Sequence, residues 1–262
     1  MKTFLQVFSC FTFLLFFTSC KKDSDANNCN ISKQSIQVNG TLMENIYYTY
    51  DKGQLKTRES NFYQTSTLVN KFISSYEYSN DKLTKLLTSY NSVPAGEFRY
   101  NYDASGKLLN VQSIRSGQIA SIQNFHYNDG KLIRISARKE NGFIVNEYDL
   151  HFTYTGDNIT FFRFQPFPTG GERRFSYTYT SYKNTLYSDP IYTYQTDNIF
   201  RLPLFLSGNL VAKEIEHDSN PQNLREFSYE MSNNDQVKKV TEKATLAGST
   251  IIIVTENSFD CK

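Results

Sequence analysis

Residues that usually carry chemistry are scarce in this chain of 262 residues. Tryptophan is absent, and there are only three histidines and four cysteines. None of His126, His151 and His217 has another His or a Cys at metal-ligand spacing, so we predict no metal site and no cofactor. Nucleophile motifs of the Gly-x-Ser-x-Gly type and phosphate-binding glycine loops are also missing. Acidic pairs such as Glu147 and Asp149 are too common to indicate a catalytic site. The sequence therefore predicts a protein that is not an enzyme.

A charge excess and a helical pattern are missing as well. The 28 Lys and Arg nearly balance the 26 Asp and Glu, whereas a nucleic-acid-binding protein needs a concentrated basic face. We find no run of ten residues with a convincing 3.6-residue period. What the chain has is 21 Phe and 19 Tyr, many of them in alternating segments that are typical of strands. Tyrosine joins an apolar body to a polar tip, which suits half-buried sheet faces and wet cavities.

A motif of the form Tyr-x-Tyr-(Asp/Asn)-x-Gly-x-Leu recurs about every 25 residues. Its clearest copies lie at residues 48–55, 76–83, 100–108, 125–132 and 152–159. Each copy predicts a hairpin, because Asn, Asp and Gly supply the positive φ angles that a tight turn needs. About eight such units predict an all-β protein with an antiparallel up-and-down meander of about 14–16 strands. We expect this meander to curl into a barrel-like or closed sheet.

The spacing of apolar residues after each turn does not fit a regular strand. Leu108 and Val111 follow Gly106 by two and five places, and residues three apart lie on opposite faces of a strand. Either a bulge follows the turn, or the first Leu packs around the tip of the hairpin. We favour the second interpretation, because Leu109 and Val111 then share one face without disruption.

The first residues predict export and lipid attachment. A basic start, an apolar run from Phe4 to Phe17 and a small-residue stop describe a secretory signal, and the run is too short to cross a bilayer comfortably. The signal ends at Cys20 and so resembles a bacterial lipoprotein signal, in which this cysteine becomes the lipidated first residue. We predict a signal peptide at residues 1–19, a flexible tether at 20–34 and the repeat β domain at 35–262.

Cys29 and Cys261 are the two cysteines left in the mature domain, one near each end. Disulfides persist in exported proteins, and this pair would close a loop of roughly 230 residues, which contributes roughly 5 kcal/mol in the chain-entropy model. Two free thiols are the alternative. We favour the disulfide, which implies that the first and last strands are neighbours.

Two segments, YNYDASGKLLNV at residues 100–111 and FHYNDGKLIRI at residues 125–135, resemble the YD repeat of secreted bacterial shell proteins. The complete architecture resembles uncharacterised Bacteroidetes lipoproteins of unknown function with a porin-like fold. The resemblance implies a meander curled into a barrel, but neither a channel nor catalytic residues. The lipoprotein leader predicts an outer-membrane location and leaves open the periplasmic or the surface face.

A ligand site should break the repeat, whereas the tyrosines occupy the same place in every unit and are interpreted as wall. The irregular stretch at residues 161–174 is therefore the candidate ligand surface: Phe161, Phe162, Arg163, Phe164, Phe167, Arg173 and Arg174. The predicted function is a lipid-anchored binding or scaffold module, with a glycan or a protein as ligand. The alternatives are an outer-membrane porin-like channel and, third, a glycan-active enzyme. Polar residues opposite Ile133 and Ile135 argue against a spanning barrel.

Overall fold

The computed structural model describes residues 29–261, except 144, 168–169, 185–201 and 234. The predicted signal peptide, the predicted lipidation site Cys20 and most of the predicted tether lie outside these residues. The last part of that tether is a strand, because β1 (Cys29–Val38) pairs with the final strand from Cys29 onward. In the described part of the chain, no helix has the length and hydropathy that a membrane span needs.

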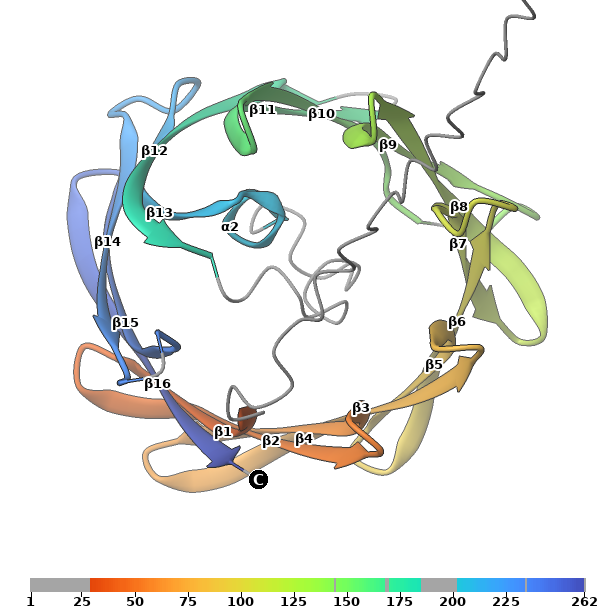
Figure 1. The fold of residues 1–262 in the computed structure, drawn as a ribbon, viewed down its shortest axis with the longest axis horizontal. Helices are drawn as coiled ribbons and strands as arrows, with labels where there is room; N and C mark the ends of the chain where they lie inside the picture. The colour runs from red at the N-terminus through yellow and green to blue at the C-terminus, as the bar shows by residue number, and fades with distance from the viewer. Residues whose placement is uncertain (1–28, 144, 168–169, 185–201, 234, 262) are drawn as a thin grey trace, which may run out of the picture.

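The described residues form sixteen antiparallel strands in one closed barrel, in which each strand pairs with its neighbours in sequence and β1 closes on β16 (Figure 1). This confirms the predicted all-β meander and its closure. After β1 the strands are β2 (Thr41–Asp51), β3 (Gln54–Gln64), β4 (Thr67–Ser79), β5 (Lys82–Tyr90), β6 (Val93–Tyr102), β7 (Leu108–Arg115), β8 (Gln118–Asn128), β9 (Lys131–Lys139), β10 (Glu147–Thr155), β11 (Asn158–Phe167), β12 (Arg173–Lys183), β13 (Asn209–Glu216), β14 (Asn223–Met231), β15 (Val237–Leu246) and β16 (Ser249–Cys261). The short helix α2 (Leu202–Leu206) lies inside the ring of strands (Figure 1).

Tight turns join most neighbouring strands, and their residues adopt the backbone angles that the motif predicts. Asp129 and Gly130 between β8 and β9 have φ angles of 47° and 80°. Two consecutive positive φ angles twist the chain in the sense that matches the flanking strands. The repeated motif turns lie at one end of the barrel, together with Cys29 and Cys261. We call this the motif end and the opposite end the far end.

A bulge follows the motif turn, so the hairpin-tip interpretation of the leucine spacing was wrong. Tyr102 pairs with Leu108 but Asn101 pairs with Asn110, which leaves Leu109 as an extra residue in β7. Leu108 and Val111 are therefore both buried, at 3% and 2% exposure, while Leu109 is 45% exposed. The same shift follows the turns of β2–β3, β4–β5, β8–β9 and β10–β11. The extra residue places two apolar side chains three apart on the same face.

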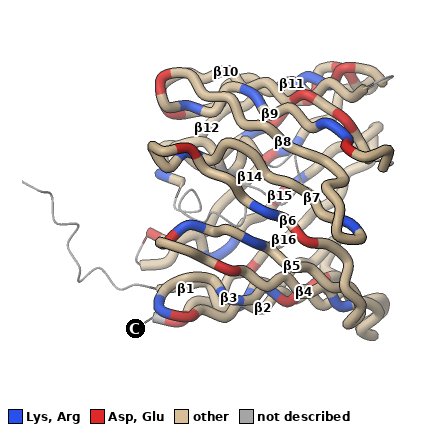
Figure 2. The backbone as a smooth tube through the Cα atoms, turned by 90° about the vertical axis from the view of Figure 1, so that its right-hand side faces the viewer, with Lys and Arg blue, Asp and Glu red and all other residues tan. Residues whose placement is uncertain are grey.

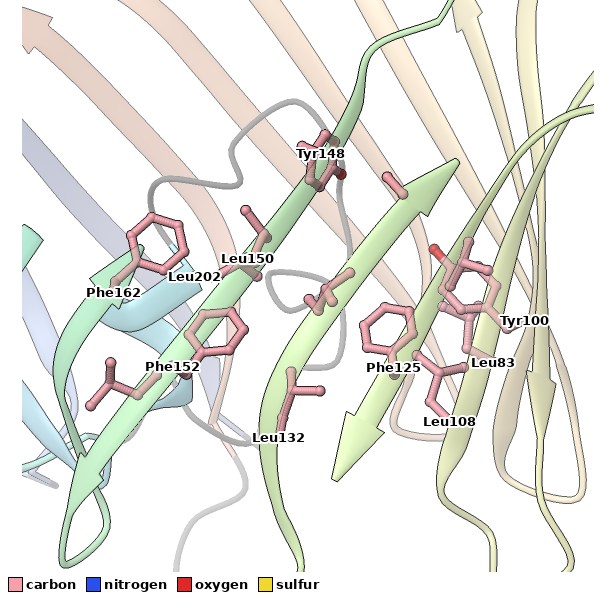
Figure 3. Close-up of a cluster of buried hydrophobic side chains, with 14 of the residues drawn as sticks. Leu83, Tyr100, Leu108, Phe125, Leu132, Tyr148, Leu150, Phe152, Phe162 and Leu202 are labelled. Atoms are coloured by element: carbon pink, nitrogen blue, oxygen red, sulfur yellow. The ribbon is translucent and has the colours of Figure 1, made fainter. Parts of the chain in front are cut away.

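The apolar face of the wall points into the barrel. Tyr148, Leu150 and Phe152 alternate along β10 and are buried in one cluster with Leu202 of α2, the helix inside the ring (Figure 3). The intervening residues Asp149 and His151 therefore face outward, because successive side chains of a strand point to opposite faces.

The second aromatic residue of the motif ties each unit to the preceding one. The Tyr102 hydroxyl donates a hydrogen bond of 2.8 Å to the Leu83 carbonyl, and Tyr154 donates one of 2.9 Å to that of Leu132. The motif Lys lies over the ring of the next unit, 5.3 Å from the Tyr102 centroid for Lys82. These contacts support the interpretation of the tyrosines as wall residues.

Cys29 takes part in a disulfide, and Cys261 stands opposite it in the register of β1 and β16. The adjacency of first and last strands, which the predicted cysteine pair implied, is confirmed by the closed barrel.

Candidate functional site

The predicted ligand surface at residues 161–174 is divided between the two faces of the wall. Phe162 and Phe164 in β11 and Arg173 in β12 face inward. Phe162 is fully buried, with its ring 5.4 Å from that of Phe152. Arg173 donates a hydrogen bond of 2.6 Å to the carboxylate of Glu216.

The other members face outward or lie at the end of β11. Phe161 and Arg163 alternate with the inward phenylalanines, and Arg174 binds Asp218 through several hydrogen bonds. Phe167 is partly exposed and lies under the guanidinium of Arg138. The structure therefore does not bring the seven residues into one surface.

Ion pairs lie on the outer face of the wall, and acidic and basic positions are spread along the strands (Figure 2). Lys71 and Glu59 are 2.8 Å apart, and Asp149 lies 2.8 Å from both Arg134 and Arg138. His151 belongs to this face, and partial burial and the nearby cations Arg163 and Arg134 lower its pKa. Among the described residues, no group of His, Cys, Asp and Glu has the arrangement of a metal site.

The inner wall of β12–β15 carries a network of acidic and basic side chains. The Arg225 Nε lies 3.5 Å from Glu214 and 3.6 Å from Glu242, two carboxylates that are almost fully buried. Burial and the neighbouring Glu214 raise the pKa of Tyr177 well above its ordinary value. Burial raises the pKa of Glu216, but hydrogen bonds from Arg173 and Asn223 outweigh it and leave that pKa lowered. This part of the wall is a set of ion pairs.

Helix α2 is fixed to the inner wall near the motif end. The Ile159 amide donates a hydrogen bond of 3.1 Å to the Ser207 hydroxyl, which also lies 2.8 Å from the Tyr179 hydroxyl. Asn184 donates to the Leu204 carbonyl at 2.7 Å. The described residues of the segment between β12 and β13 therefore occupy part of the lumen.

A cavity of about 330 Å³ lies against the inner wall of β4–β10, towards the far end. This volume is within the range of about 300–1,000 Å³ that is typical of small-molecule sites. Its lining combines aromatic rings, hydroxyl groups and amides, and it includes Phe72, Ser74, Thr88, Gly96, Phe98, Ser113, Arg115, Ser121, Gln123, Asn146 and Tyr148.

The polar groups of the cavity are partly preorganised. Gln123 donates a hydrogen bond of 2.7 Å to the Tyr148 hydroxyl, and Thr88 donates one of 3.2 Å to the Gly96 carbonyl. The Ser74 side chain is fully buried, and its hydroxyl has no hydrogen-bond partner among the described residues. A Cβ atom at Gly96 would lie 3.2 Å from the Thr88 hydroxyl, so glycine keeps this part of the wall open.

Sequence reasoning missed this cavity because its residues lie outside the motif. The available signal was the polar character of inward-facing positions in the far half of each unit. Ser74 and Gln123, for example, follow the same alternation as the buried aromatics Tyr76 and Phe125.

Comparison with known proteins shows the fold and leaves the activity open. No family model and no curated protein matches the chain. A porin-like protein from Bacteroides uniformis matches with a TM-score of 0.60 and 15% identity, over 88% of this chain and 98% of that one. A porin-like protein from Bacteroides vulgatus covers the same shares at 8% identity and a TM-score of 0.37. A TcdB2–TccC3 structure matches 80% of this chain with 14% of its own, at 14% identity and a TM-score of 0.30. The first match, together with the sixteen-stranded barrel, confirms the predicted porin-like fold.

Proposed function

We propose that this protein is a lipid-anchored binding or scaffold module of the bacterial cell envelope, and that its barrel stands in water. The observation that carries the proposal is the charged outer face of the wall, where ion pairs lie, whereas the cluster of buried aromatic and aliphatic residues faces the lumen. No catalytic function is part of the proposal.

The alternative is a porin-like channel, which the number of strands favours, because barrels of 16–18 strands enclose an aqueous pore in porins. A membrane barrel, however, needs an outward apolar band, and a Lys or Arg on its lipid face costs about 2–4 kcal/mol at the bilayer midplane. Here the outward residues include Lys71, Arg134 and Arg138 with their acidic partners. Helix α2 also occupies part of the lumen (Figure 1).

The proposed anchor fits the position of the first strand. β1 begins at Cys29 at the motif end, and the preceding residues 21–28 span at most about 30 Å when extended. A lipid on Cys20 would hold the motif end near the membrane. The far end with its cavity would then face away from the membrane.

Two measurements test this proposal. Metabolic labelling with a palmitate analogue should mark the wild-type protein and not the Cys20→Ala variant. The Cys20→Ala protein without its signal peptide should be monodisperse in detergent-free buffer and should give no conductance steps in planar bilayers. A protein that needs detergent and conducts ions would favour the channel instead.

A further inference from the structure

We propose that the cavity on the inner wall of β4–β10 binds the end of an uncharged oligosaccharide, with one sugar ring against its aromatic and hydroxyl-bearing lining. This inference rests on the proposed function, because a barrel that stands in water presents the cavity to soluble glycans. The described lining of this cavity contains no residue of the irregular stretch at residues 161–174.

The aromatic side of the cavity suits the apolar face of a sugar ring. Phe72 of β4 and Phe98 of β6 are half-buried on the inner wall, and Tyr148 of β10 belongs to the same lining. The hydrogen bond from Gln123 holds the Tyr148 hydroxyl in place. Aromatic rings offer large rigid contact areas, and a polar tip such as that of Tyr148 suits a wet site.

The polar side requires a ligand rich in hydroxyl groups. Ser113 and Ser121 are direct partners in the register of β7 and β8, so two hydroxyls stand side by side in the lining. Ser74 also belongs to the lining, and its buried hydroxyl has no hydrogen-bond partner among the described residues. An aliphatic ligand would leave these groups unsatisfied, whereas a sugar hydroxyl both donates and accepts hydrogen bonds.

The charge of the cavity indicates a neutral ligand. Among the described residues of the lining, Arg115 alone is charged, and its side chain is exposed. Other inward carboxylates are paired with arginines: Glu214 and Glu216 on β13, Glu242 on β15, and Glu44 on β2, whose partner is Arg58 of β3. Among the lining residues that the structure describes, no buried charge is therefore positioned to hold an ionic group.

Exposed apolar residues extend the site at the far end. Tyr90 is 45% exposed and pairs in register with Phe72 of the cavity. Its hydroxyl binds the Asn70 side chain at 2.5 Å, which fixes the ring at the rim. Val93 on the same hairpin is 64% exposed. A second sugar ring of a chain would find an aromatic surface here, so we expect oligosaccharides to bind more tightly than monosaccharides.

The test is isothermal titration calorimetry of the mature full chain, purified with its lipid in mild detergent. The probes are gluco-, xylo-, manno- and galacto-oligosaccharides, their monosaccharides, and oligogalacturonate as the acidic arm. We expect at least one neutral oligosaccharide to bind. Phe98→Ala should weaken its binding roughly tenfold or more, because a stacking surface is lost. Ser113→Leu, which fills the cavity, should abolish binding, and Tyr182→Ala, an exposed aromatic residue outside the cavity, should leave it unchanged.

Circular dichroism melts show whether each variant is folded. Phe98 also packs against the core, so Phe98→Ala could lose binding by unfolding, and Ser113→Leu is therefore tested as a second variant. The absence of binding to every sugar of the panel would overturn the sugar site. Binding that survives both Phe98→Ala and Ser113→Leu, or a preference for oligogalacturonate, would overturn it as well. In each case the proposed envelope function still holds if the protein takes up the palmitate label, is monodisperse without detergent and gives no conductance steps. A failure of the sugar site can therefore be distinguished from a failure of the proposed function.

Discussion

Replacing each of two adjacent leucines by alanine tests the bulge on which the inner face of the barrel depends. Leu108 is 3% exposed and belongs to the core, whereas Leu109 is 45% exposed on the other side of β7. The two residues have the same chemistry and differ only in the direction that the bulge gives them. The pair is therefore its own matched control.

The expected effects differ by several-fold in free energy. Leu108→Ala removes buried methyl groups and leaves a cavity, which costs about 2–5 kcal/mol of unfolding free energy. Leu109→Ala should stay within about 0.5 kcal/mol of the wild type, because an exposed side chain loses little on truncation. With an m-value near 3 kcal/mol/M, a loss of about 3 kcal/mol lowers the urea midpoint by about 1 M.

Far-ultraviolet circular dichroism in urea measures both midpoints, and the m-values show whether the unfolded state has changed. Leu132→Ala and Ile133→Ala repeat the comparison in β9, where Leu132 is buried and Ile133 is exposed. Equal losses at Leu108 and Leu109, or a larger loss at Leu109, would refute the bulge. Such a result would instead support the interpretation that Leu108 packs around the tip of the hairpin.

Three further predictions concern hydrogen bonding, pH and the barrel seam. Tyr102→Phe should cost about 1 kcal/mol in urea unfolding, whereas Tyr182→Phe at an exposed position should cost almost nothing. Burial raises the pKa of Tyr179 to about 12, so the unfolded chain loses this proton first, near its ordinary value. The contribution of Tyr179 to the free energy of unfolding is therefore complete below pH 10 and is lost as the pH rises toward 12. Tyr179→Phe should flatten the decline in urea midpoints between pH 9 and 11.5. Cys29→Ser and Cys261→Ser should each lower stability by roughly 5 kcal/mol or less, and the double variant no further; additive losses would exclude a bond between them.

The architecture was predictable because it is repeated locally. Each unit carries its own turn residues, such as Asp129 and Gly130, and its own alternating strands, so a short stretch of sequence specifies a hairpin. Eight similar hairpins leave few arrangements other than one continuous sheet. Closure is a long-range feature of the sheet, and the positions of Cys29 and Cys261 at the two ends of the domain indicated it.

The inner and outer faces were harder to predict, because they depend on the register of single residues. A shift of one residue exchanges the two faces of a strand, and the sequence Leu108-Leu109 gives no indication of which leucine is the inward one. Residues 161–174 looked like one surface in sequence but separate onto two faces in the barrel, because successive side chains of β11 and β12 point to opposite faces. The cavity depends on distant strands as well: Phe72, Phe98 and Tyr148 come from β4, β6 and β10.

The division of the barrel along its axis explains how such a wall could acquire a site without losing its fold. Near the motif end, the first aromatic residue and the leucine of each unit are buried, and the second tyrosine is tied to the preceding hairpin. Substitutions there remove core packing and contacts between units. Toward the far end, the inward residues Ser74, Ser113 and Gln123 line the cavity, where the repeated packing is absent. Changes to these residues alter the shape and polarity of the lumen while the motif contacts persist. Stability should therefore depend mainly on one end of the barrel and ligand choice on the other.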